Sequence, residues 1–173
     1  TTQVAVMDML AVYMARRLGR LEDAVYHQMV EELLRLPELV QRSIEINPAL
    51  QALAEKYHSH NDIFFIGRNL DYAACLEGSL KLKEISYLHS EAYAAGELKH
   101  GTIALIERDR PVIALACCEV LLDKMLSNIQ EVKARGAEVL AVVLEGEEKI
   151  VHEADDVILI PKTHPLLNSV AEV

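Results

Sequence analysis

One stretch of the sequence places titratable side chains at a spacing that could support proton transfer. Glu77, Lys81 and Glu84 stand four and three residues apart. A helix would therefore place two carboxylates and one ammonium group on a single face. The same spacing is common on solvated helix surfaces, where such a pair adds only about 0.3 kcal/mol to helix stability. A catalytic strip and a solvated strip are both compatible with the spacing alone.

The segment that follows favours the catalytic interpretation. Residues 89–101, HSEAYAAGELKHG, place two histidines, two glutamates and a lysine among alanines and glycines. We expect a loop here, because small residues beside titratable groups suit close approach of the backbone to a ligand or a partner subunit. His100 is a candidate for proton transfer near neutral pH, although a histidine taken alone is more often structural. His89 is expected to be a core or cap residue.

The remaining pattern predicts the scaffold that must position these groups. Short strands that are apolar throughout alternate with helices of ten residues or more. The expected strands are 62–67, 111–116, 138–143 and 156–160, and the expected helices between the first three are 72–89 and 119–134. Such strands form a parallel sheet covered on both faces and joined by right-handed crossovers. The fold class is therefore α/β, a doubly wound parallel sheet flanked by helices from residue 47 onward.

The loops beyond these strands are poorly suited to hold a phosphate group. Ligands of doubly wound folds bind beyond the carboxyl ends of the strands. Residues 67–72 contain one glycine and no serine or threonine, and residues 116–119 contain none of the three. A phosphate cradle usually offers glycine and hydroxyl groups beside a helix N-terminus. Dinucleotide and P-loop motifs are also missing, so we expect no nucleotide site and no cofactor.

Helical patterns precede the α/β domain. We expect helices at 1–17, at 21–36, from Pro37 to Ile46, and from Asn47 to about Tyr57. The middle two make a connector more than a domain.

Composition and charge exclude several classes of function. A formal net charge of −10 without a lysine or arginine block argues against nucleic acid as a partner. Charges interrupt every apolar run, so we expect no membrane span. The N-terminus TTQVAVMDML lacks the basic start of a secretory signal, so we expect a cytoplasmic protein. Cys75, Cys117 and Cys118 lack the spacing of a zinc site and are expected to be free thiols. His58 and His60 have no third ligand nearby in sequence, so no metal site is expected.

Residues 76–107, LEGSLKLKEISYLHSEAYAAGELKHGTIALIE, closely resemble the second sugar-isomerase (SIS) domain of the isomerising glutamine:fructose-6-phosphate aminotransferases, the glucosamine-6-phosphate synthase family. The N-terminal TTQ and its apolar helix are similar to the closing helix of that family's first SIS domain, and residues 127–136 are similar to a later helix. The resemblance implies a closing helix at 1–19, a helical connector at 20–46 and a second SIS domain at 47–173, truncated at its C-terminus.

The resemblance also implies a role for each candidate residue. Members of this family make glucosamine 6-phosphate from fructose 6-phosphate and glutamine. Glu84 matches the carboxylate that moves a proton between C1 and C2 of the sugar, and Lys81 matches the lysine beside it. Glu77 matches a neighbouring active-site acid. His100 matches the histidine that assists ring opening, and in the family's homodimers it reaches the site of the opposite subunit.

The same resemblance implies that this chain is an incomplete enzyme. The glutaminase, the Ser/Thr-rich phosphate loops of the first SIS domain and the tail lysine that forms a Schiff base are missing, so the isolated chain is expected to be inactive. Two alternatives stay open. A SIS-domain deglycase or deaminase of amino-sugar phosphates should diverge around GELKHG, and a non-catalytic SIS module that senses sugar phosphates should carry a Ser/Thr phosphate loop in this domain.

Overall fold

Short apolar strands form a fully parallel sheet in the computed structural model, which describes residues 1–108 and 110–173. The five strands within these residues are β1 (Asp62–Gly67), β2 (His89–Ala94), β3 (Val112–Ala116), β4 (Val139–Leu144) and β5 (Asp156–Ile160). Their order is β2-β1-β3-β4-β5. β2 lies on one side of β1 and the later strands lie on the other side, so the strand order reverses between β1 and β3. Doubly wound folds place their ligands at such a point. The predicted fold class is confirmed.

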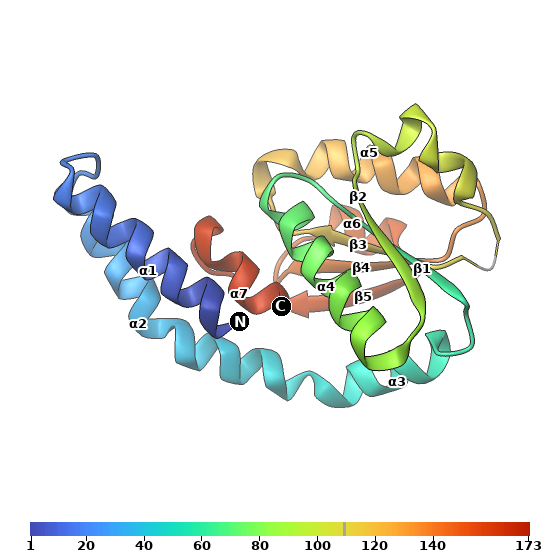
Figure 1. Cartoon of the computed structure of the whole chain (residues 1–173), viewed down its shortest axis with the longest axis horizontal. Helices are drawn as coiled ribbons and strands as arrows, with labels where there is room; N and C mark the ends of the chain where they lie inside the picture. The colour runs from blue at the N-terminus through green and yellow to red at the C-terminus, as the bar shows by residue number, and fades with distance from the viewer. Residues whose placement is uncertain (109) are drawn as a thin grey trace.

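Helices cover both faces of this sheet (Figure 1). One face carries α3 (Asn47–Tyr57) and α4 (Leu70–Ser86). The other face carries α5 (Leu122–Lys133), α6 (Lys149–Glu153) and two short 3-10 helices, η1 (Leu98–His100) and η2 (Thr102–Leu105). A further 3-10 turn, η3 (Glu119–Leu121), leads into α5.

Side chains of the strands alternate between the two faces of the sheet, and each face therefore has its own hydrophobic core. In β1, Ile63 and Phe65 pack with Cys75 of α4. Phe64 and Ile66 point to the other face, where they join Ile129 of α5. Because successive side chains of a strand point to opposite faces, one apolar strand anchors both helical layers.

Two long helices extend away from the sheet as a hairpin (Figure 1). They are α1 (Thr2–Arg17) and α2 (Asp23–Glu45). The C-terminal elements, η4 (Pro165–Leu167) and α7 (Asn168–Glu172), pack between the hairpin and the sheet. Within the described residues, the structure has no helix with the length and apolar composition that a bilayer crossing requires.

The predicted helix start at Pro37 is wrong, because α2 continues through it. Leu36 and Leu39 lie on either side of the proline and are buried against Leu167 and Val170. A proline inside a helix removes one backbone hydrogen bond. Burial of the leucines on both sides outweighs that loss, so the helix does not break.

The expected loop at 89–101 is also only partly correct. Its first six residues form β2, which pairs in parallel with β1 from Asp62↔His89 to Gly67↔Ala94. The preceding helix ends at Ser86 instead of His89, because Tyr87 adopts a left-handed conformation with φ of 61°. β2 lies at the edge of the sheet and lacks the apolar run that identified the other strands.

A pair of buried hydroxyl groups fixes α4 against this edge strand. Ser79 and Ser90 are 2% and 1% exposed. Their Oγ atoms lie 2.9 Å apart, and the Ser90 hydroxyl also lies 2.9 Å from the Ser79 carbonyl oxygen, to which it can donate. We expect Ser79→Ala and Ser90→Ala each to lower the free energy of unfolding by about 1–2 kcal/mol, because each removes the buried hydrogen bond between the two hydroxyls. Ser90→Ala also leaves the Ser79 hydroxyl without a partner, whereas in Ser79→Ala the Ser90 hydroxyl still donates to the residue-79 carbonyl oxygen.

The double variant provides the sharper test of this contact. Once both hydroxyls are gone, neither remains unsatisfied, so S79A/S90A is expected to cost less than the sum of the single variants. Urea unfolding measures the three values. Ser86→Ala is the control, because that hydroxyl is exposed and bonds only locally, and it should change stability by less than about 0.5 kcal/mol. Additive losses would contradict the coupling.

Candidate active site

The outer face of α4 brings together the three residues that the spacing predicted. Lys81 Nζ lies 2.7 Å from Glu84 Oε2 and 3.7 Å from Glu77 Oε1. The hydrogen bond from Lys81 to Glu84 is the main cause that raises the pKa of the lysine, so its ammonium group stays charged. The shared face is confirmed. Chemically, the strip offers carboxylates that can accept a proton and a cation that can stabilise negative charge.

This strip is open to solvent in the single chain. The side chains of Lys81 and Glu84 are 48% and 53% exposed. The same helix region also exposes four apolar residues: Leu76, Leu80, Ile85 and Tyr87. An exposed apolar surface next to a charged strip is typical of an interface, and proton transfer is more efficient where water is excluded. The site is therefore expected to be completed by another protein surface.

Close contact with the sheet holds the middle of α4 in place. A Cβ atom at Gly78 would lie 3.1 Å from Cε1 of Phe65 in β1. The glycine thus lets the helix backbone lie directly against the aromatic ring, one residue after Glu77. Contact at this position, together with the Ser79–Ser90 bonds, fixes the rotation of α4 and so the direction of its charged face.

The amino end of α4 is held by a buried carboxylate that sequence reasoning missed. Asp71 is 3% exposed, and its Oδ2 accepts hydrogen bonds from the backbone N–H groups of Cys117 at 2.9 Å and Cys118 at 3.0 Å. Burial raises the pKa of Asp71 to about 6, against the opposing effect of these bonds. The sequence signal was weak, since an aspartate in the first turn of a helix usually indicates only a surface cap.

Asp71 lies at the carboxyl end of the sheet between β1 and β3, the position at which the strand order reverses. The N–H groups of Cys117 and Cys118 follow the carboxyl end of β3, where doubly wound folds often bind an anionic ligand. Here the chain's own carboxylate takes that position.

A second buried carboxyl group lies close to Asp71. Both side-chain oxygens of Glu172, in α7, are buried without a hydrogen-bond partner among the described residues. Burial, followed by the charge of Asp71, raises the pKa of Glu172 to about 8. Asn168, one turn earlier, donates from Nδ2 to the Cys117 carbonyl oxygen at 3.1 Å. The hydrogen bond of Asn168 docks α7 against the end of β3.

His100 lies on the opposite side of the sheet from Glu84. It ends η1, whose Leu98 is 1% exposed and packs in the core beneath α5, whereas α4 covers the other face. The imidazole is 64% exposed, and its Nε2 atom lies 4.0 Å from Glu97 Oε2. One chain therefore does not bring His100 to the strip on α4.

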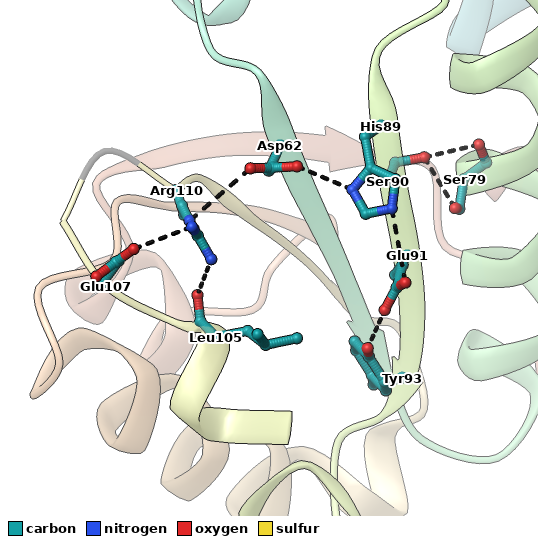
Figure 2. A network of polar contacts seen from close by, with 9 residues as sticks. All are labelled: Asp62, Ser79, His89, Ser90, Glu91, Tyr93, Leu105, Glu107 and Arg110. Carbon is teal, nitrogen blue, oxygen red and sulfur yellow. Dashed lines mark hydrogen bonds and ion pairs between the residues drawn. The ribbon is translucent and has the colours of Figure 1, made fainter. Parts of the chain in front are cut away.

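The expectation that His89 is a core or cap residue is wrong. Its side chain is 58% exposed, with Nδ1 2.8 Å from Asp62 Oδ1 and Nε2 3.6 Å from Glu91 Oε1 (Figure 2). Glu91 in turn accepts a hydrogen bond from Tyr93, and burial followed by this bond raises the pKa of Tyr93 to about 12. An edge strand exposes such alternating polar side chains, which explains the difference.

Arg110 connects this network to the chain that leads into β3. Its guanidinium group lies 3.9 Å from Asp62 and 3.0 Å from Glu107, and it donates to the Leu105 carbonyl oxygen at 2.9 Å (Figure 2). Asp62 and His89 are the first residues of β1 and β2. The network is thus anchored at the amino ends of these strands, opposite the ligand end, and we infer that it is structural.

Neither the strip on α4 nor the polar network suggests a metal centre. Within residues 1–108 and 110–173, no group of three histidine, cysteine, aspartate or glutamate side chains is arranged to hold a metal ion. The cysteines at 75, 117 and 118 are free thiols.

Comparison with known proteins identifies the architecture. The model of the SIS domain family matches residues 56–170. Glutamine–fructose-6-phosphate aminotransferase (isomerizing) of Thermus thermophilus is 47% identical over 173 residues, which is 100% of this chain and 29% of that protein. The corresponding protein of Clostridium tetani is 49% identical over 162 residues, 94% of this chain and 27% of that protein.

A solved structure agrees with these sequence relatives. The C-terminal domain of glucosamine-fructose-6-phosphate aminotransferase from Francisella tularensis is 34% identical, with a TM-score of 0.84 over 94% of this chain and 47% of that chain. The chain spans less than a third of the length of the curated relatives it matches. The family model covers more than half of the chain, and the parallel sheet fits it, so this chain belongs to the SIS domain family.

Proposed function

We propose that this chain is the second SIS domain in the isomerase part of a cytoplasmic glutamine:fructose-6-phosphate aminotransferase. Such an enzyme converts fructose 6-phosphate and glutamine-derived ammonia into glucosamine 6-phosphate. The observation that carries the proposal is the contact of Lys81 with Glu84 and Glu77 on α4, within a chain 47% identical to such an aminotransferase. In this proposal residues 1–19 form the last helix of a preceding SIS domain. Residues 20–46 are a helical connector between the two domains, and residues 47–173 form the second SIS domain.

The chemistry assigns a different task to each side chain of the strip. Moving a proton from C1 to C2 of a sugar requires one base on one side of the substrate, and Glu84 on a packed helix can be that base. Lys81 is 2.7 Å from it and can orient the carboxylate and stabilise the oxygen charge that develops beside it. Glu77 is a neighbouring acid on the other side of Lys81.

The proposed enzyme is a homodimer in which His100 assists ring opening in the site of the partner subunit. The position of His100 across the sheet from α4 supports this arrangement, because a single chain cannot bring it to Glu84. Exposed apolar side chains on α1 further support an extensive interface with another domain or subunit; they are Val6, Met7, Met9, Leu10, Tyr13 and Met14. The glutaminase and the first SIS domain, which would hold the sugar phosphate, complete the enzyme.

A product assay tests the proposal against its alternatives. A full-length aminotransferase that contains this chain is incubated with fructose 6-phosphate and glutamine. We expect glucosamine 6-phosphate and glutamate to form together. Release of ammonia from glucosamine 6-phosphate, without glutamine-dependent synthesis, would favour the deglycase or deaminase. Binding of sugar phosphate without turnover would favour the sensing module.

A further inference from the structure

Arg68 occupies a constrained position at the carboxyl end of β1. It directly follows Gly67, the last residue of that strand. A Cβ atom at Gly96 would lie 2.8 Å from Nη2 and 2.9 Å from Nη1 of the arginine. The edge of the guanidinium group that carries Nη1 and Nη2 therefore faces the backbone at Gly96. Any side chain at residue 96 would have to displace it.

The guanidinium group is fixed from its other side by α5. Arg68 Nε donates to Oδ1 of Asn128 at 3.2 Å, and Asn128 is itself 5% exposed and donates from Nδ2 to Glu131 Oε2 at 3.2 Å. Among the described residues, no carboxylate forms an ion pair with Arg68. A guanidinium group that is held by a buried amide and has no carboxylate partner is better suited to support the neighbouring backbone than to neutralise a charge.

The backbone that rests on Arg68 is the turn that carries His100. Ala95 N donates to the Gly67 carbonyl oxygen at 2.9 Å, directly before the contact at Gly96. The turn then closes through His100 N, which donates to the Glu97 carbonyl oxygen at 3.0 Å. The hydrogen bond between Ala95 and Gly67 therefore holds the start of the turn beside Arg68.

The imidazole of His100 has little else to direct it. Its side chain is 64% exposed, and within residues 1–108 and 110–173 its one ion-pair contact is the distant one with Glu97, at 4.0 Å. The buried Leu98, 1% exposed, anchors the middle of the turn in the core. The direction of His100 therefore depends on the backbone between Gly96 and Gly101, which rests on Leu98 and on Arg68.

We infer that Arg68 is a positioning residue for His100, with its guanidinium group, held by Asn128, forming the support for the turn from Gly96 to Gly101. The inference deepens the proposed function, because it assigns to Arg68 the placement of the histidine that assists ring opening. Arg68 itself contacts neither the strip on α4 nor the reacting atoms in this account.

Backbone hydrogen exchange in this chain tests the support without any assay of activity. Arg68→Met keeps the length of the side chain and removes the planar donor, and Gly96→Ala displaces the guanidinium group. Both variants are expected to speed exchange at the His100 amide by about tenfold or more, while amides of β3 and β4 stay unchanged. Arg42→Met is the control, since that exposed arginine pairs with Glu145 far along the sequence from the turn. Unchanged exchange at His100 in both variants overturns the inference.

A second variant covers the case in which Arg68→Met does not fold. Asn128→Ala removes the hydrogen bond that fixes the guanidinium group, and it should speed exchange at the same amides by a smaller factor. Protection that is unchanged in both G96A and N128A would overturn the inference in that case.

A double-mutant cycle in the full-length aminotransferase then asks whether Arg68 acts through His100. R68M should lower kcat about tenfold in the wild-type background and have no further effect when His100 is Ala. An equal loss in both backgrounds overturns the inference. If the full-length protein makes no glucosamine 6-phosphate at all, the proposed function fails, and the exchange measurement still decides the support separately.

Discussion

Glu84→Gln is expected to lower glucosamine 6-phosphate formation by about 10²–10⁴-fold in the full-length aminotransferase, with little change in glutamine hydrolysis. The amide has nearly the same size as the carboxylate and can still accept a hydrogen bond from Lys81, which lies 2.7 Å away. It cannot take up a proton from carbon, and the loss of a positioned base typically has an effect of this size. The two activities are measured separately, as sugar product and as released glutamate.

The control for this prediction is another exposed glutamate of the chain. Glu31 lies on α2, away from the strip on α4, and Glu31→Gln should leave both activities unchanged. Isomerisation at near wild-type rate in the Glu84 variant would show that another group is the base. A parallel loss of glutamine hydrolysis would instead indicate damage to the fold, which urea unfolding of this chain would detect.

Asp71→Ala is expected to lower the free energy of unfolding by about 2–4 kcal/mol, the largest stability effect that we predict. It removes the oxygen that accepts hydrogen bonds from Cys117 and Cys118 and leaves both N–H groups unpaired. Because both bonds end on Oδ2, the amide oxygen of Asp71→Asn can replace it, and this variant should stay within about 1 kcal/mol of wild type.

Urea unfolding at pH 7 measures both variants, with Asp123→Ala as the control. Asp123 is exposed and pairs with Lys149, so its loss should change stability by less than about 0.5 kcal/mol. A cost for Asp71→Ala as small as that of the control would contradict the proposed role of this carboxylate in docking α4.

The pH dependence of stability distinguishes the charge of Asp71 from its hydrogen bonds. Burial raises the pKa of the carboxyl group from 3.8 to about 6, so the folded state binds this proton more tightly than the unfolded state. Its contribution therefore favours folding below pH 4 and is lost as the pH rises from about 4 to 6. The free energy of unfolding of wild type relative to D71N should fall across that window. A constant difference would contradict the shift.

The sequence predicted features that depend on local periodicity. The strand at 156–160 has the predicted bounds, and the shared face of Glu77, Lys81 and Glu84 follows from the helical repeat. The edge strand at 89–94 could not be predicted in the same way, because its outer side chains are polar. Its strand conformation depends on backbone pairing with β1.

Features that depend on contacts between residues far apart in the sequence could not be predicted from local patterns. Helix α2 continues through Pro37 because residues near 167–170 bury its flanks. Asp71 bonds to backbone groups 46 and 47 residues later. The separation of His100 from Glu84 depends on which face of the sheet the chain covers after β2, and no spacing within the segment specifies that choice.

The most direct test of the central claim uses a mixed dimer of the full-length aminotransferase. One chain carries Glu84→Gln and the other carries His100→Ala, and each homodimer of these variants is expected to be nearly inactive. If each site combines Glu84 of one subunit with His100 of the other, the mixed dimer retains one intact site and recovers about half of the wild-type rate of glucosamine 6-phosphate formation. Activity no higher than that of the single-variant homodimers would contradict the account.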